Sequence, residues 1–146
     1  MKFNLCMNVM ALLLAVVMVA TPVTAATSDP AEPMASALLS DYSASAARPT
    51  SGAVKVKYSV TGMTLLDKIG AKSIKVYQSY DKHNWTLVKT YNASSTSGML
   101  ISDDFSHSGS VTYSGYVGVY YKAYVQLYGE NNGTSEIKYK WTSVVV

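Results

Sequence analysis

The residues best suited to ligand binding lie between Val119 and Gly129, where two sets of side chains alternate. The alternation predicts a strand with one packed face and one wet face, because successive side chains of a strand point to opposite sides. The set expected in the core is Val119, Tyr121, Ala123, Val125 and Leu127. The outward set, which forms the candidate ligand face, is Tyr120, Lys122, Tyr124, Gln126 and Tyr128.

Two interpretations of the outward tyrosines stay open. Successive outward side chains lie about 6.8 Å apart along a strand, so the rings could line a shallow track for an extended polymer such as a glycan. Lys122 and Gln126 would then donate hydrogen bonds between the rings. Alternatively, the tyrosines only pair with neighbours across the strands, each pair adding ~0.2–1 kcal/mol of stability.

No other group of residues indicates chemistry. His83 falls in an expected turn, and Asp103 and Asp104 with His107 offer fewer oxygen ligands than a hard cation takes. Neither a Gly-x-Ser-x-Gly elbow nor a Ser/Lys arrangement is present. The single cysteine, Cys6, lies in the expected signal peptide, which excludes disulfides and thiolate sites from the mature chain. We therefore predict no catalytic residue, no cofactor and no metal.

Residues 1–25 have the features of a secretory signal peptide. Lys2 precedes an apolar run from Leu5 to Ala20, and small residues allow cleavage near Ala25. A membrane anchor is the alternative, but this run of roughly 16 residues is shorter than the ~20 that a spanning helix needs. We expect a protein that is secreted and released, with no stable membrane span after signal cleavage.

Residues 26–52 are rich in Ala, Ser and Pro and are expected to form a flexible spacer before a domain at 53–146. A brief helix at Glu32–Leu39, or a pro-segment, is the alternative for part of the spacer. Three Asn-x-Ser/Thr sequons begin at Asn84, Asn92 and Asn132, and whether they are used depends on the source organism.

Short strands are expected throughout the domain. The first carries Val54, Val56, Tyr58 and Val60 on its inner side. Leu65–Gly70 is expected to be a loop or helical turn that plugs the core. Ser73–Tyr80 and Trp85–Tyr91 should form a hairpin around Asp81–Asn84, with Trp85 in the core in phase with Leu87. An outward Trp85, acting as a ligand platform, is the alternative.

The second half of the domain continues in the same way. Short strands are expected at Gly98–Ser102 and Ser110–Ser114, with Phe105 buried between them. A corner at Gly115–Gly118 leads into the alternating strand. A turn at Glu130–Gly133 then leads into a last strand at Thr134–Val146. In that last strand Ile137, Tyr139, Trp141 and Ser143 should share one face. About seven strands without a long helix predict an all-β antiparallel sandwich.

Several of these segments carry a family resemblance. Ile74-x-Val76, Trp85-x-x-Val88, Tyr121-x-Ala123-x-Val125 and the Asn132-Gly133 turn resemble the second half of a fibronectin type III or immunoglobulin-like domain. The resemblance implies that Tyr121 packs at a corner and hydrogen-bonds to backbone. The first half departs from it, because the tryptophan of an early strand is missing.

The chain also resembles a group of small secreted proteins from Gram-positive bacteria. The segments that carry this likeness are Gly62–Ala71, Ile74–Trp85 and Tyr121–Gly133. This second resemblance implies secretion and brings no activity with it.

Composition narrows the function classes to three. The chain is 14% charged with a formal net charge of +3, and its basic residues are dispersed, which argues against nucleic acid as a partner. A non-catalytic binding or adhesion module for a glycan, a cell wall or a protein surface is the favoured class. A self-assembling structural protein is the first alternative, because edge strands, few charges and the apolar Val144–Val146 favour association. A small enzyme is the second.

Overall fold

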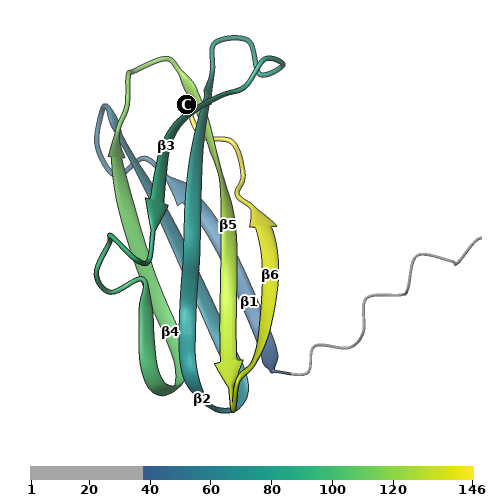
Figure 1. Cartoon of the computed structure of the whole chain (residues 1–146). Helices are drawn as coiled ribbons and strands as arrows, with labels where there is room; N and C mark the ends of the chain where they lie inside the picture. The colour runs from purple at the N-terminus through teal and green to yellow at the C-terminus, as the bar shows by residue number, and fades with distance from the viewer. Residues whose placement is uncertain (1–37) are drawn as a thin grey trace, which may run out of the picture. The chain divides into compact units, whose positions relative to one another are not determined.

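The computed structural model describes residues 38–146, and these form an antiparallel all-β unit without a helix (Figure 1). Its strands are β1 (Leu39–Ala47), β2 (Ala53–Ser79), β3 (Thr86–Asn92), β4 (Leu100–Ser114), β5 (Tyr120–Asn131) and β6 (Thr134–Trp141). The prediction of an all-β antiparallel fold is confirmed. The predicted signal peptide at 1–25, and the first part of the predicted spacer, lie outside the described residues.

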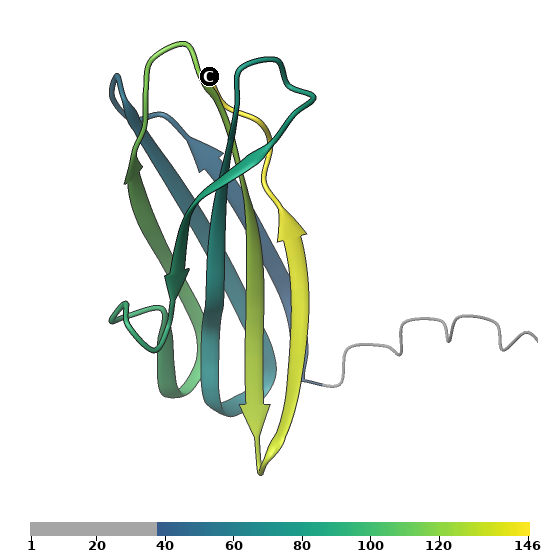
Figure 2. The ribbon, with the colours of Figure 1, turned by 45° about the horizontal axis from the view of Figure 1, so that its top comes forward.

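Strand β2 connects the two halves of the fold. Its first half pairs with β1 on one side and with β4 on the other, whereas its second half pairs with β5 on one side and with β4 and then β3 on the other. Pairing with β4 is interrupted between Thr61 and Leu66, where the chain reverses its direction. The sheet therefore curls over, so that its two halves face each other across the core (Figure 2).

This continuous strand corrects the expectation for Leu65–Gly70. The segment is neither a loop nor a helical turn, because from Lys68 onward it pairs with β5 at Glu130 and beyond. Two side chains of this strand segment nevertheless fill the end of the core that the expected plug was to close. Leu66 and Ile69 are 1% and 0% exposed and close the core at the bend.

Strand β4 follows the same bend and corrects two further expectations. It is one strand from Leu100 to Ser114, and it pairs with β2 on both sides of the corner. Phe105, expected in the core, is 50% exposed at this bend. The strand reverses there, so the alternation that would have turned Phe105 inward does not continue.

Strand β1 lies inside the predicted flexible spacer, so that prediction was wrong for residues 39–47. It pairs with β2 from Leu39 opposite Gly62 to Ala47 opposite Lys55. Leu39 is buried, and Tyr42 and Ala44 pack against the core. The signal was weak because two of the four inward residues are alanines and most of the outward residues are serines, which resembles a low-complexity linker.

The alternating patterns of β2 and β5 produce the core as predicted. The inner residues of the first half of β2 and the inner residues of β5 are all buried. They meet Ile74 and Val76 from the second half of β2. Tyr121 is fully buried, and its hydroxyl accepts a hydrogen bond from the backbone N–H of Tyr116 at 2.9 Å. Tyr121 is therefore buried and hydrogen-bonded to backbone.

Both expected hairpin turns form. At the β2–β3 turn, a carboxylate oxygen of Asp81 accepts the backbone N–H groups of His83 and Asn84, each at 2.8 Å. These bonds, that of Asn84 first, lower the pKa of Asp81. At the β5–β6 turn, Asn132 and Gly133 have φ angles of 49° and 76°, as a two-residue type I′ turn requires.

A side chain crosses each open side of the curled sheet. On one side, the Tyr91 hydroxyl of β3 donates to the backbone carbonyl of Thr112 in β4 at 2.8 Å. On the other, the Glu136 carboxylate of β6 accepts the backbone N–H groups of Leu38 and Leu39 at 2.8 and 3.0 Å. These bonds connect edge strands that do not pair with each other through their backbones.

Candidate ligand-binding face

The predicted ligand face lies on the outer side of the half-sheet formed by β3, the second half of β2, β5 and β6. Tyr120, Lys122, Tyr124 and Gln126 point outward and are partly exposed, as the alternation of β5 predicts. Tyr128 is also on this side but is only 8% exposed, because other side chains cover it. The structure therefore provides four accessible members of the predicted set and one covered member.

Two tryptophans flank Lys122. The Lys122 Nζ atom lies 4.2 Å from the ring centroid of Trp85 and 4.5 Å from that of Trp141. Both distances are within the range of cation–π attraction, in which the ring faces stabilise the ammonium. Lys122 thereby holds two indoles that are far apart in the sequence, one before β3 and one at the end of β6.

The position of Trp85 corrects the prediction that it packs into the core. Trp85 is partly exposed on the outer face, and its indole N–H donates to the backbone carbonyl of Lys82 at 3.2 Å. Leu87, expected to be buried in phase with it, is 47% exposed. The register shift between Val76 and Tyr77 disturbs the phase at this end of the hairpin, so alternation counted from the sequence does not predict burial there.

Tyr124, Tyr139, Trp141 and Tyr77 form a continuous group of rings. Tyr124 stacks on Tyr139 with centroids 5.4 Å apart and an interplanar angle of 7°, and it lies 4.7 Å from Trp141. Tyr77 lies 5.4 Å from Trp141 on the other side. Tyr139 and Trp141 are 51% and 49% exposed. We call Tyr77, Trp85, Lys122, Tyr124, Tyr139 and Trp141 the aromatic face.

The sequence analysis placed Ile137, Tyr139 and Trp141 on one face but did not bring them beside Tyr124. The sequence does contain a signal that places Tyr124 beside Trp141. A two-residue turn at Asn132-Gly133 pairs Asn131 with Thr134, and counting outward from that pair sets Tyr124 opposite Trp141, as observed. Tyr77 could not be found in this way, because a bulge near Ala71 shifts its pairing with β5.

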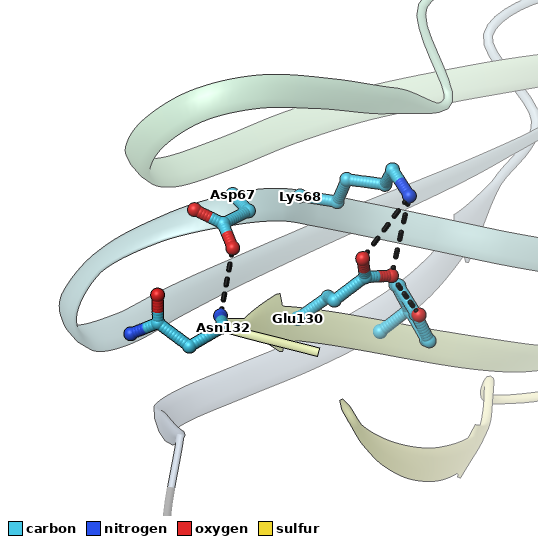
Figure 3. Close-up of polar contacts among 5 residues, drawn as sticks. Asp67, Lys68, Glu130 and Asn132 are labelled. Carbon is cyan, nitrogen blue, oxygen red and sulfur yellow. Dashed lines mark hydrogen bonds and ion pairs between the residues drawn. The ribbon is translucent and has the colours of Figure 1, made fainter. Parts of the chain in front are cut away.

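On the outer side of β5, near the β5–β6 turn, several charged residues lie together. Lys68 Nζ donates to the two carboxylate oxygens of Glu130 at 3.1 and 3.3 Å (Figure 3). The Tyr128 hydroxyl donates to the same carboxylate, and Lys72 Nζ lies 4.9 Å from the Tyr128 ring centroid. Asp67 accepts the backbone N–H of Asn132 at 2.7 Å and so anchors the adjacent turn to β2 (Figure 3).

These contacts reinforce the usual protonation states of the group. The hydrogen bonds from the Tyr128 hydroxyl and then from Lys68 lower the pKa of Glu130. The hydrogen bond to Glu130 raises the pKa of Lys68, and together with burial it raises the pKa of Tyr128. At neutral pH Glu130 is therefore ionised, Lys68 is protonated and Tyr128 is neutral.

A cleft of about 460 Å³ opens beside this group, and we call it the charged cleft. Its walls come from β2, β5, the start of β4 and the turn after β3. Its lining residues are Lys68, Lys72, Asn92, Ala93, Ser94, Leu100, Tyr128 and Glu130.

The histidines and the paired aspartates, considered above for a metal site, do not lie together. Asp104 accepts the backbone N–H of Phe105 at 2.7 Å, whereas His107 Nε2 lies 2.7 Å from the Gly98 carbonyl and 3.3 Å from the Tyr58 hydroxyl. Within residues 38–146, no three or more His, Cys, Asp or Glu side chains are grouped so as to hold a metal ion. Over the same residues, no helix long and apolar enough to cross a membrane is present.

Charge is distributed unevenly along the strands. Six of the seven acidic residues between 38 and 146 lie at the end that contains the β2 and β4 bends and the β5–β6 turn (Figure 1). They are Asp41, Asp67, Asp103, Asp104, Glu130 and Glu136. The seventh, Asp81, lies at the opposite end and is hydrogen-bonded within its own turn. Arg48 and Lys82 also lie at that opposite end, whereas at the acidic end Lys68 and Lys138 pair with Glu130 and Glu136.

Comparisons with known proteins add little to this geometry. No protein-family model matches the chain, and no curated protein sequence matches it either. Among solved structures, the sporulation control protein Spo0M of Bacillus subtilis is similar, with 12% identity and a TM-score of 0.42. The match covers 70% of this chain and 47% of that chain, so it spans less than half of Spo0M.

Proposed function

We propose that this chain is a secreted, non-catalytic binding module and that its aromatic face binds an extended glycan. The observation that carries the proposal is the arrangement around Lys122, where exposed rings are held in fixed positions by one another and by an ammonium. Rings that are ordered before binding lose little conformational freedom when a ligand stacks on them, which favours affinity.

The shape of the face supports a polymer rather than a small compact ligand. The rings come from β2, the β2–β3 turn, β5 and β6 and lie on the surface of a sheet. An open surface of this kind offers stacking contacts to the flat side of a sugar ring, while Lys122 and Gln126 supply donors for hydroxyl groups. The cell wall is the expected location of such a polymer if the chain is exported.

An immunoglobulin-like or fibronectin III-like class for the fold is part of the same proposal. It is supported by the curled antiparallel sheet and by the bond from the Tyr116 amide to the buried Tyr121 hydroxyl. Domains of that class present binding surfaces on a rigid sandwich, which suits an adhesion role.

The test is a binding screen on polysaccharides with one variant and one matched control. The chain from Ala26 onward is incubated with insoluble cellulose, chitin and peptidoglycan and with soluble glycans, and bound protein is measured. Trp141→Ala should weaken binding roughly two- to tenfold, because one aromatic contact contributes ~0.5–1.5 kcal/mol and 1.4 kcal/mol is a factor of ten. Tyr116→Ala, which removes another exposed ring from a loop outside the face, should bind like the parent.

Two results would overturn the proposal. One is the absence of binding to every polysaccharide. The other is a folded Trp141→Ala variant that binds as tightly as the parent, which would place the site elsewhere on the domain.

A further inference from the structure

The charged cleft lies on the same strand and the same side of the sheet as the aromatic face. Strand β5 pairs with β6 without interruption from Tyr124 to Asn131, so Tyr124, Gln126 and Tyr128 all lie on its outer side. Tyr124 and Tyr128 are four residues apart, which is about 14 Å along a strand. A polymer that crosses the aromatic face along β5 therefore reaches the cleft.

The cleft has an excess of positive charge. Glu130 is its only acidic group, and its carboxylate already accepts hydrogen bonds from Lys68 and Tyr128. The ion pairs found among residues 38–146 are Lys68–Glu130 and Lys138–Glu136, so Lys72 forms none there, although its charge helps to lower the pKa of Glu130 after the Tyr128 and Lys68 hydrogen bonds. Lys72 is exposed, and its ammonium lies over the Tyr128 ring at the edge of the cleft.

The remaining walls favour a polar group of moderate size. Asn92 offers an amide and Ser94 a hydroxyl, while Ala93 and Leu100 provide a small apolar side. The volume of about 460 Å³ is within the usual range of small-ligand sites. A carboxylate or a phosphate on a sugar would pair with Lys72 and accept hydrogen bonds from these neighbours.

We propose that the charged cleft is a subsite for an anionic group, a carboxylate or a phosphate, carried by the glycan that crosses the aromatic face. This inference rests on the proposed function and adds the chemical class of the polymer, which is an acidic glycan. The acidic group occupies the cleft about 14 Å from the sugar that stacks on Tyr124.

The experiment compares an acidic polymer with its uncharged ester and adds a second acidic polymer of different chemistry. Oligogalacturonate carries a carboxylate on every sugar, and its methyl ester has the same backbone without the charge. A glycerol-phosphate polymer tests phosphate as the source of the anion. Affinities are measured for the parent chain at two salt concentrations.

The expected result is that the parent binds at least one of the two acidic polymers about tenfold more tightly than the ester. Lys72→Gln should abolish this preference without weakening binding of the ester, and Lys72→Arg should keep it. Lys57→Gln is the matched control, because it removes the same charge from an exposed lysine on the other half of the sheet. It should keep the preference.

The outcomes separate the two proposals. If the parent binds neither acidic polymer nor the ester nor any glycan of the earlier screen, the proposed function fails and this inference fails with it. If the ester binds as tightly as both acidic polymers, the glycan function stands and the anionic subsite is wrong. The subsite is also wrong if Lys72→Gln retains the preference, if Lys57→Gln loses it equally, or if single-stranded DNA binds as tightly as the acidic polymers.

Discussion

Lys122 makes contacts that the sequence pattern did not predict. Its position on β5 is polar and outward, as predicted, but its ammonium is enclosed by Trp85 and Trp141. A cation between two rings stabilises their orientation and keeps a charge within a surface that is otherwise aromatic. The residue thus makes a structural contact and places an ammonium on the candidate ligand face.

The half-exposed position of Trp85 leads to a stability prediction. Trp85→Ala should lower the free energy of unfolding by only about 1 kcal/mol, because a partly exposed cation–π contact contributes ~0.5–1 kcal/mol. Ile74→Ala, at a fully buried position, should cost ~2–5 kcal/mol and serves as the comparison. Urea denaturation of both variants measures the difference. A loss for Trp85→Ala as large as that for Ile74→Ala would mean that the ring belongs to the core.

At the level of strands, regular alternation made β5 predictable and its absence hid the bend in β2. The inner residues of β5 are large and apolar, so the pattern was clear. At the bend, Met63 and Leu65 are exposed while Leu66 and Ile69 are buried, so apolar residues fall on both sides. A reversal in the middle of a strand produces such a mixture, which resembles a loop in the sequence.

Two glycines show how differently the bend and the turn tolerate a side chain. Gly70, with φ of 146°, follows the bend, and a Cβ there would overlap the Met99 carbonyl oxygen, which accepts the Ala71 amide. Gly133, with φ of 76°, has no atom in the way of a Cβ. Gly133→Ala should cost about 1–2 kcal/mol from backbone strain alone.

Gly70→Ala should add an overpacking cost of ~1–3 kcal/mol to a similar strain, so its melting temperature should be clearly the lower of the two. Thermal denaturation of both variants tests the order. Equal melting temperatures would show that the loop around Met99 moves aside without cost.

For the whole domain, the largest error of the sequence analysis concerns where the domain begins. A chain that starts at Ala53, the predicted boundary, lacks β1, which covers one edge of β2 and contributes Leu39 to the core. We expect this chain to be unfolded or aggregated, because an uncovered edge and a missing core residue both favour association. A chain that starts at Ala37 should fold.

Circular dichroism and size-exclusion chromatography of the two chains make this comparison. A cooperative melt of the shorter chain at the temperature of the longer one would show that β1 is dispensable. In that case the boundary predicted from the sequence would be adequate after all.

The separation of acidic residues from Arg48 and Lys82 gives the domain a permanent electric dipole along its strands. In the field of an anionic wall, such a dipole experiences a torque that turns the acidic bends outward and brings the opposite loops toward the wall first. This orientation acts before any contact forms, so the end of the aromatic face beside Trp85 and Lys122 meets the wall before the charged cleft does. It fades within a Debye length of about 8 Å at physiological salt, so the domain is aligned only during its final approach.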